Sequence, residues 1–263
     1  MSAASPAPAL PWHARAAMLL RLFAVQGAWN YETMLGNGIA FALEPALRRL
    51  PGGVGGSEFR SAMAREVRYF NAHPYLAAVA VGALARAELD HVPSEQIDRF
   101  RAALCGPLGS IGDRLIWAGW LPACAMLALL AFGWGAKPLL VVLLFLATHN
   151  AGHIAVRLWG LNAGWRQGLH VAGALAHPLL REGPQWFAAA TLVMASVALP
   201  LTVRRVIAEG GGTVPSAAGT LTAVAILAAL LWGVALVRLQ GRIEGWKIAF
   251  AALVFAAVMA VIR

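Results

Sequence analysis

Polar side chains suited to a hydroxylated ligand gather in one short stretch, Gln26–Glu32. Gln26, Asn30 and Glu32 can exchange hydrogen bonds with hydroxyl groups, and Trp29 offers an aromatic face on which a sugar ring packs. The stretch adjoins apolar segments, where buried polar groups usually have a function. The alternative is that Trp29 belongs to an interfacial aromatic belt and that Gln26 and Asn30 cap a helix.

Two further polar segments interrupt apolar sequence. Asn71-Ala72-His73-Pro74 is typical of a helix break, because Pro74 suits a first helical turn and Asn71 can accept from free backbone amides. A capping turn without a ligand is the simpler interpretation of this segment. The glycine-rich run Gly106–Asp113 indicates either a ligand loop or a tight hairpin that lets helices pack closely.

His149 and His153 stand four residues apart, the spacing at which two metal ligands share one helix face. Asn150 lies between them, and the glutamate of the H-E-x-x-H zinc motif is missing. Polar contacts with a neighbouring helix are the favoured interpretation, and a membrane metalloenzyme is the alternative. The sequence has no phosphate-cradling loop with its lysine, no nucleophile elbow and no dinucleotide fingerprint, so we expect no catalytic residue, cofactor or metal site.

The elements that must position these residues are apolar helices. Of the 263 residues 60% are hydrophobic and 13% are charged, and five long runs lack Asp, Glu, Lys and Arg. These runs are Leu115–Ala136, Pro138–Val156, Gln185–Val203, Ala217–Val237 and Ile248–Ile262. About 20 apolar residues cross the hydrocarbon core of a bilayer. The runs therefore predict an all-α, multi-pass membrane protein with about five transmembrane helices.

The first part of the chain differs in composition, and we divide the chain accordingly into residues 1–14, 15–114 and 115–263. Residues 1–14 form an Ala- and Pro-rich tail that we expect to be disordered and that lacks the pattern of a secretory signal. Residues 15–114 carry most of the acidic side chains and predict interfacial and re-entrant helices. Residues 115–263 hold the spans. The net charge of +9 fits an anionic membrane surface better than nucleic acid.

Four segments of the N-terminal region are expected to be helical. The expected helices are Arg15–Leu50, interrupted at Gly36-Asn37-Gly38, and then Ser57–Phe70, Pro74–Ala87 and Pro93–Leu104. The apolar segment Pro74–Ala87 is too short for a span and indicates a half-membrane, re-entrant helix.

Four stretches resemble, in the same order, the IID subunits of mannose-family sugar phosphotransferase systems. They read QGAWNYETMLGNGIAFALEPALRRL, YFNAHPYLAAVAVGALARAE, LCGPLGSIGDRLIWAGWLP and, more loosely, LFLATHNAGHIAVRLWGLNAGWRQG. Together they cover about residues 20–170. The resemblance implies a multi-pass protein of the bacterial inner membrane with a cytoplasmic N-terminus.

The same resemblance implies a set of partners. The chain would assemble with a IIC membrane subunit as a trimer of heterodimers that carries a hexose across the bilayer. Soluble IIA and IIB domains would pass phosphate to the sugar, and this chain would be neither phosphorylated nor catalytic alone. Half-helices would form a core that moves around the sugar.

The motifs also imply roles for individual residues. The positions that match are Gln26, Trp29, Asn30, Glu32, Asn71 and Asp113. The first four would contact the sugar, with Trp29 packing on the ring or bracing the site, whereas Asn71 and Asp113 would hold the broken helices. Glu88 matches a family acid and is expected to pair with an arginine such as Arg86 or Arg101.

The sequence departs from the family pattern in four places. Ala72 stands where the family usually has Thr, Leu89 where it has a second acid, and Arg114 where it has a small residue or Pro. The segment Arg204–Ala218 is short where typical members carry a longer outer loop. The short segment leaves open a degenerate, regulatory or sensory membrane protein of the same family that does not transport.

Overall fold

The computed structural model describes residues 10–211 and Leu227, and every regular element in that part of the chain is helical. The predicted all-α fold is confirmed. The described part of the chain divides into two compact units, one of residues 10–124 and 143–188 and the other of residues 125–142 and 189–211. All residues of the candidate site lie in the first unit.

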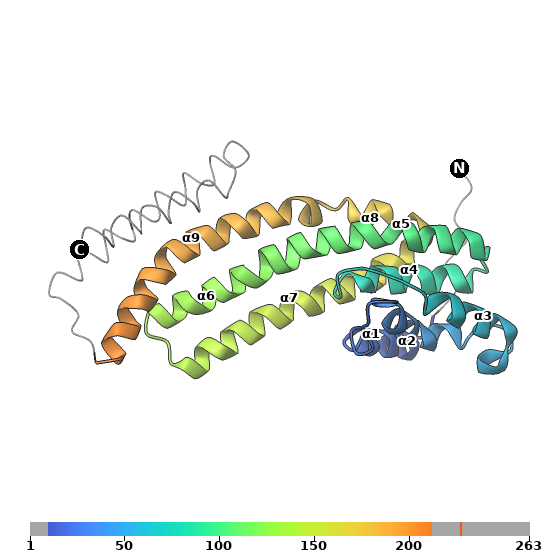
Figure 1. The fold of residues 1–263 in the computed structure, drawn as a ribbon, viewed down its shortest axis with the longest axis horizontal. Coiled ribbons are helices and arrows are strands. Elements are labelled where there is room, and N and C mark those ends of the chain that lie inside the picture. Colours follow the sequence, from blue (N-terminus) through green and yellow to red (C-terminus); the bar gives the residue numbers. More distant parts are fainter. Residues whose placement is uncertain (1–9, 212–226, 228–263) are drawn as a thin grey trace. The chain divides into compact units, whose positions relative to one another are not determined.

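The elements follow one another along the chain as shown in Figure 1. They are α1 (Trp12–Leu22), α2 (Gly36–Leu47), η1 (Gly53–Gly55), α3 (Ser57–Glu66), α4 (Ala77–Leu89), α5 (Ser94–Gly112), η2 (Asp113–Trp120), α6 (Leu121–Gly133), α7 (Pro138–Gln167), η3 (Gly168–His170), α8 (Ala172–Leu175) and α9 (Pro178–Glu209).

Within the described residues, three helical stretches are long and apolar enough to cross a bilayer: Ser94–Gly133, Pro138–His170 and Ala172–Glu209. They contain the predicted spans Pro138–Val156 and Gln185–Val203, and all but the last three residues of Leu115–Ala136. The remaining two, Ala217–Val237 and Ile248–Ile262, lie outside the described residues apart from Leu227. Many apolar side chains of α7 and α9 are exposed on this chain, as is expected of helices that face lipid or a membrane partner.

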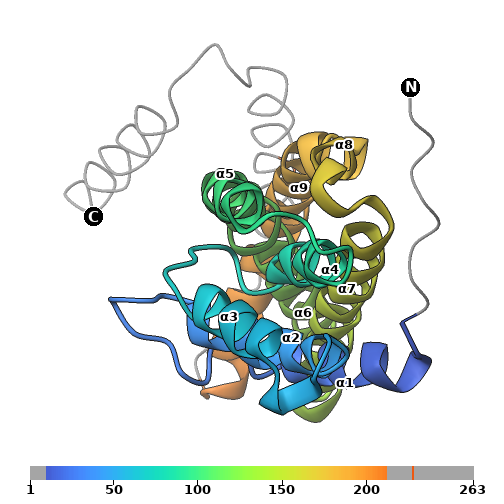
Figure 2. The same ribbon diagram turned by 90° about the vertical axis from the view of Figure 1, so that its right-hand side faces the viewer.

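The core of the first unit is built around α4, which lies among α1, α2, α5 and α7 (Figure 2). Every residue from Ala77 to Glu88 is buried. The helix has 13 residues, too few to cross a bilayer. It is rich in Ala and Gly, and an added Cβ at Gly82 would lie 2.3 Å from the carbonyl oxygen of Leu161 on α7. Small residues thus let the two backbones cross in contact.

The predicted interruption at Gly36-Asn37-Gly38 is wrong. The break is a non-helical loop at residues 23–35, and α2 begins at Gly36; α1 begins at Trp12 rather than Arg15. Both glycines are needed for close packing: an added Cβ would lie 2.2 Å from the Arg68 carbonyl oxygen at Gly36 and 1.8 Å from the Val25 carbonyl oxygen at Gly38.

The glycine-rich run Gly106–Asp113 is also not a break. Helix α5 continues through Pro107 to Gly112, and a π-helical segment, η2, joins it to α6. Gly112 is again a packing residue, because an added Cβ would lie 2.1 Å from the Cβ atom of His73. Neighbouring groups within a membrane protein can satisfy the backbone that a helical proline or a π-turn frees.

Candidate functional site

The three polar segments that the sequence singles out lie next to one another. The Leu35 amide donates to the Phe70 carbonyl at 2.9 Å, and the Phe70 amide donates to the Thr33 carbonyl at 3.1 Å. These bonds join the loop 23–35 to the segment before α4. The His73 amide then donates to the Leu108 carbonyl of α5 at 3.3 Å. Backbone bonds therefore connect all three segments in one place.

Asn30 shapes the loop 23–35. Its Oδ1 atom accepts from the backbone amides of Glu32 and Thr33, both at 2.9 Å. Its Nδ2 atom donates to the Thr33 hydroxyl at 2.8 Å and to the Ala28 carbonyl at 3.2 Å. Both polar atoms of Asn30 are thus engaged in the loop. Met34, which follows, has a φ of 52°, a left-handed conformation that is uncommon for a non-glycine residue and marks a constrained turn.

The other side chains of the first cluster are exposed on this chain. Gln26 and Glu32 are exposed, and the indole of Trp29 is 45% exposed and meets the Tyr31 ring edge-on at 4.8 Å between centroids. The loop therefore presents an amide, a carboxylate and two aromatic rings outward. A ligand held by these groups would need a second wall to exclude water.

Asn71 and Asp113 are likewise exposed. At the break before α4 the side chain that accepts a backbone hydrogen bond is that of His73, whose Nδ1 atom takes the Tyr75 amide at 3.2 Å. Asp113 is the first residue of η2 and follows Gly112, which packs on His73. The two residues flank the contact between the second and third segments.

Arg157 on α7 contacts two of the three polar segments, namely the start of the loop 23–35 and the stretch just before α4. It is 4% exposed, and its Nη1 atom lies 2.7 Å from His153 Nδ1. Its Nε atom donates to the Leu22 carbonyl at 3.4 Å, where the loop 23–35 leaves α1. Its guanidinium lies over the ring of Tyr75 at 4.2 Å and over that of Phe23 at 5.0 Å. No carboxylate pairs with it in the part of the chain that the structure describes.

His73 joins the same cluster from the other side. Its buried ring meets the rings of Tyr75 and Trp117 edge-on, at 4.9 and 4.8 Å between centroids. Burial and, to a lesser extent, the nearby Arg157 cation together lower the pKa of His73 to about 4. The imidazole is therefore neutral at physiological pH, which suits a site that already holds a buried cation.

We predicted polar contacts with a neighbouring helix for His149 and His153. His149 does bond another segment, just before α4, whereas the hydrogen-bond partners of His153 lie on its own helix, α7. His149 Nε2 lies 3.3 Å from the Tyr75 hydroxyl, and His153 Nε2 lies 2.8 Å from the Asn150 side-chain oxygen. Among the described residues no group of three His, Cys, Asp or Glu side chains is arranged to hold a metal. These contacts give the metalloenzyme alternative no support.

Glu88 pairs with Arg65 rather than with Arg86 or Arg101. The Arg65 guanidinium holds both Glu88 oxygens, each at 2.7 Å from Nη2. Because α4 turns Glu88 towards α3, the nearest cation is on α3. Arg101 instead pairs with the fully buried Glu66, and burial raises the pKa of Glu66, an effect that the Arg101 charge opposes.

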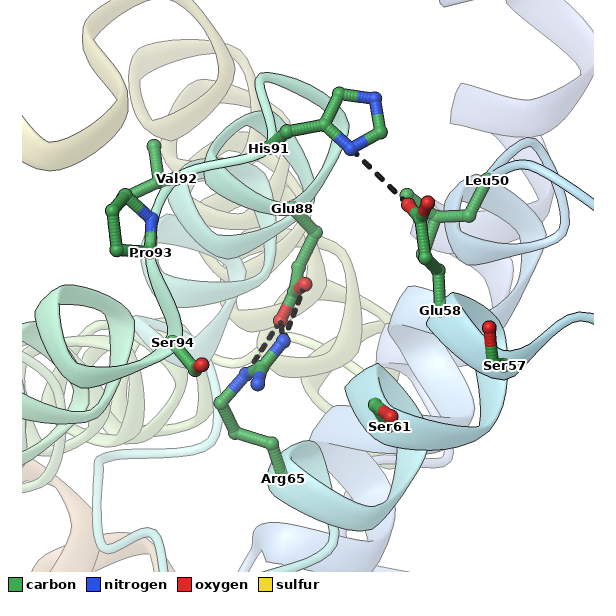
Figure 3. Close-up of a pocket in the computed structure, with 10 residues that line it drawn as sticks. All are labelled: Leu50, Ser57, Glu58, Ser61, Arg65, Glu88, His91, Val92, Pro93 and Ser94. Atoms are coloured by element: carbon green, nitrogen blue, oxygen red, sulfur yellow. Dashed lines mark hydrogen bonds and ion pairs between the residues drawn. The ribbon is translucent and has the colours of Figure 1, made fainter.

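Above the Arg65–Glu88 pair lies a polar cavity of about 350 Å³ between α3, the end of α4 and the start of α5 (Figure 3). His91 and Glu58 pair across it at 3.2 Å. The cavity is lined by charges of both signs, from two carboxylates and an arginine, and by three serine hydroxyls. The cavity is separate from the three converging segments.

Arg157 and Tyr75 are not among the residues predicted from the sequence. Arg157 directly follows the uncharged run Pro138–Val156, and a charged residue four positions after His153 in an apolar helix is itself a signal of a buried polar cluster. Tyr75 gave no comparable signal, because a single tyrosine after a helix break is common at a membrane interface.

The chain is similar to proteins of one known family. A family model described as "PTS system mannose/fructose/sorbose family IID component" matches residues 10–204. The mannose-specific EIID component of Escherichia coli is 29% identical over 173 residues, 63% of this chain and 59% of that protein. The fructose permease IID component of Bacillus subtilis is 29% identical over 209 residues, 74% of each chain. The match thus spans less than two thirds of the mannose-specific relative.

Two solved structures share the fold. One is a chain of the mannose transporter ManYZ in complex with a microcin, with 23% identity, a TM-score of 0.55, and coverage of 96% of this chain and 97% of that one. The other is described only as a membrane protein, with 22% identity, a TM-score of 0.64, and coverage of 97% and 98%.

Proposed function

This chain belongs to the mannose/fructose/sorbose family of phosphotransferase-system IID components, and from that membership we propose that it is the membrane subunit which, together with a IIC partner, forms a permease for a hexose. Family membership and three apolar helices place it in a bacterial membrane. In the proposed complex, phosphorylated IIB, recharged by IIA, transfers its phosphate to the sugar. This chain binds and guides the sugar and performs no chemistry itself.

The observation that carries the proposal is the convergence of the three polar segments around Phe70 and His73. Neutral sugars are bound by groups that donate and accept hydrogen bonds around an aromatic face. In the proposed site Gln26 and Glu32 bond sugar hydroxyls and Trp29 packs on the ring. Asn30 sets the shape of the loop that carries them and contacts the sugar at its edge.

Asn71 and Asp113 have a different proposed role. Each flanks the contact between the segment before α4 and the α5–η2 junction, and we propose that they hold these two junctions in place around the sugar. Ligand sites in transporters are often built from interrupted helices near mid-membrane, where the core moves as a body between the two faces.

The exposure of Gln26, Trp29 and Glu32 supports a second wall supplied by the IIC partner. A bound sugar would then be enclosed between the two subunits, which exclude water from its hydrogen bonds. We further propose the trimer of IIC–IID heterodimers and a cytoplasmic N-terminus, the side on which IIB can reach the emerging sugar.

The test is sugar uptake in cells supplied with the matching IIC, IIB and IIA, comparing the natural chain with Glu32→Gln. The control is Glu95→Gln, which makes the same change at another exposed glutamate, at the start of α5. We expect phosphorylated sugar with the natural chain and the control, and roughly a tenfold loss or more with Glu32→Gln at equal membrane levels.

The absence of sugar uptake by the natural chain would contradict the transport proposal itself. If an intact complex with the natural chain accumulates no common hexose, the transport proposal is wrong. A regulatory or sensory protein of the same family, favoured by the short segment Arg204–Ala218, is then the better account.

A further inference from the structure

A second cavity, of about 340 Å³, lies between α1 and the end of α2. Its charged lining consists of Arg21, Arg48, Arg49 and Glu44. None of these residues takes part in the converging segments described above, and the proposed transport function does not use them. We propose that this cavity binds the phosphate headgroup of an anionic phospholipid.

The charges of the cavity favour an anion. Glu44 is paired twice, with Arg21 at 2.6 Å and with Arg48 on the next helical turn. The single carboxylate is therefore already neutralised, and positive charge remains. The Arg48 side chain is 59% exposed, and the Arg49 side chain is exposed without a hydrogen-bond or ion-pair partner among the described residues. Both can reach a phosphate diester, which arginine binds with paired hydrogen bonds.

Arg21 is held ready for such a ligand. Its Nη1 atom donates to the Phe41 carbonyl at 2.9 Å, and its guanidinium lies over the Phe41 ring at 4.6 Å. These contacts fix one cation in the wall of the cavity at little further cost in side-chain entropy on binding. The two exposed arginines at the end of α2, Arg48 and Arg49, then close over the ligand.

The residues exposed on α1 beside the cavity indicate that the ligand also has an apolar part. The residues Ala14, Met18 and Leu22 form one strip and are buried against the protein. Trp12 and Leu20, 80% and 70% exposed, lie with Ala16 on a second, apolar strip. The cavity residues His13, Ala17 and Arg21 lie between these two strips at the same four-residue spacing.

This arrangement matches a helix lying in the membrane interface. An interfacial helix places its apolar strip among acyl chains and its basic strip at the headgroups. Basic pockets between helices bind anionic headgroups in membrane proteins. Inorganic phosphate or a sugar phosphate would need only the arginines and would leave Trp12 and Leu20 unexplained, so the apolar strip selects a lipid.

The test uses the complex purified from membranes in detergent, with phosphatidylglycerol as the probe and bound lipid counted by native mass spectrometry. We compare the natural chain with Arg48→Gln/Arg49→Gln. The matched control is Arg60→Gln/Arg99→Gln, which removes two exposed arginines elsewhere in the same unit. We expect the first pair to weaken binding roughly 25-fold, about fivefold for each arginine, and the control to leave it unchanged.

A second pair of variants tests the lipid chains. Trp12→Ser/Leu20→Ser should weaken phosphatidylglycerol binding without changing any binding of inorganic phosphate. Equal binding of phosphatidylglycerol by the natural chain and the Arg48/Arg49 variant would overturn the proposal. So would displacement of the lipid by millimolar glucose 6-phosphate, which would indicate a site for soluble anions.

One further outcome would also overturn it. If the Arg48/Arg49 variant loses its IIC partner while its lipid count stays the same, the cavity accepts an acidic side chain of that partner and not a lipid.

Discussion

The guanidinium carbon of Arg157 lies 4.2 Å from the centre of the Tyr75 ring, and the same side chain donates to the carbonyl of Leu22. One cation on α7 thus contacts the chain where the loop 23–35 begins and where α4 is about to begin. These are the two places that set the positions of Gln26–Glu32 and Asn71. We infer that Arg157 is a positioning residue for the proposed sugar site.

Replacing Arg157 tests this inference. We expect Arg157→Met to lower stability by about 3 kcal/mol, because it removes two buried charged hydrogen bonds and two cation–π contacts. It should also raise the KM for sugar uptake more than it lowers the maximal rate. Arg157→Lys keeps the charge and should restore part of both losses. Thermal unfolding in detergent and uptake kinetics measure the two effects, and an unchanged KM with a lowered Tm would reduce Arg157 to a purely structural role.

We expect sugar uptake to depend on the Oδ1 atom of Asn30, which accepts two backbone hydrogen bonds within the loop 23–35. Asn30→Asp keeps the oxygen that takes the amides of Glu32 and Thr33, whereas Asn30→Ala removes it. We expect the Ala variant to lose most uptake at equal membrane levels and the Asp variant to keep the larger share. Uptake of labelled sugar decides between them. Equal loss in both variants would instead point to direct recognition of the sugar by the Asn30 Nδ2 group.

The stability of the fold should depend on pH through His73. Its pKa in the folded chain is lowered to about 4 from an ordinary value of 6.5. As the pH falls from about 6.5 to about 4, the unfolded chain takes up a proton that the folded chain does not, so stability falls across this window. The loss should be at most about 3 kcal/mol.

His73→Asn isolates this contribution. The asparagine oxygen can still accept the Tyr75 amide but does not titrate in this range. Unfolding midpoints measured from pH 7.5 to pH 4 should fall less steeply for the variant than for the natural chain. Parallel pH profiles for the two proteins would contradict the assignment.

The buried pair of Arg101 and Glu66 should show strong coupling. Arg101→Met leaves the Glu66 carboxylate fully buried without its cation and should cost about 3–5 kcal/mol. Adding Glu66→Leu should recover much of that loss, because two apolar side chains can replace a buried ion pair. A double-mutant cycle in thermal unfolding measures the coupling, and simple additivity of the two changes would show that the pair is not coupled.

The glycines of the described helices should fall into two groups. At Gly82 an added Cβ would lie 2.3 Å from the Leu161 carbonyl oxygen, so Gly82→Ala should cost several kcal/mol by forcing α4 and α7 apart. At Gly109 an added Cβ meets nothing within 4 Å, so Gly109→Ala should stabilise α5 by up to about 1 kcal/mol. Unfolding midpoints of both variants test the distinction, which equal effects would refute.

The sequence predicted the helices of this protein better than their junctions. Runs without charge found the spans around Leu115–Ala136, Pro138–Val156 and Gln185–Val203 because hydropathy is a property of each segment alone. Gly36, Gly38 and Gly112 were interpreted as breaks, yet each makes room for a neighbouring element. Hydropathy and local spacing contain no information about that neighbour.

For the candidate site too, the residues could be predicted from the sequence but the contacts between them could not. Residue types singled out three polar segments, and the structure brings them together. Their contact depends on backbone hydrogen bonds of Leu35, Phe70 and His73, and backbone groups are the same in every residue. The role of Arg157 was similarly hidden, since its partners Leu22 and Tyr75 lie far away in the sequence.

The burial of α4 from Ala77 to Glu88 bears on how the protein is made. A helix of 13 residues is too short to be inserted as a span, and its packing surface on α7 is synthesised much later in the chain. During synthesis α4 therefore cannot reach its buried position until α7 has entered the bilayer, and we expect it to lie at the membrane surface until then. The proposed sugar site, which depends on both helices, is consequently assembled only after most of the chain has left the ribosome.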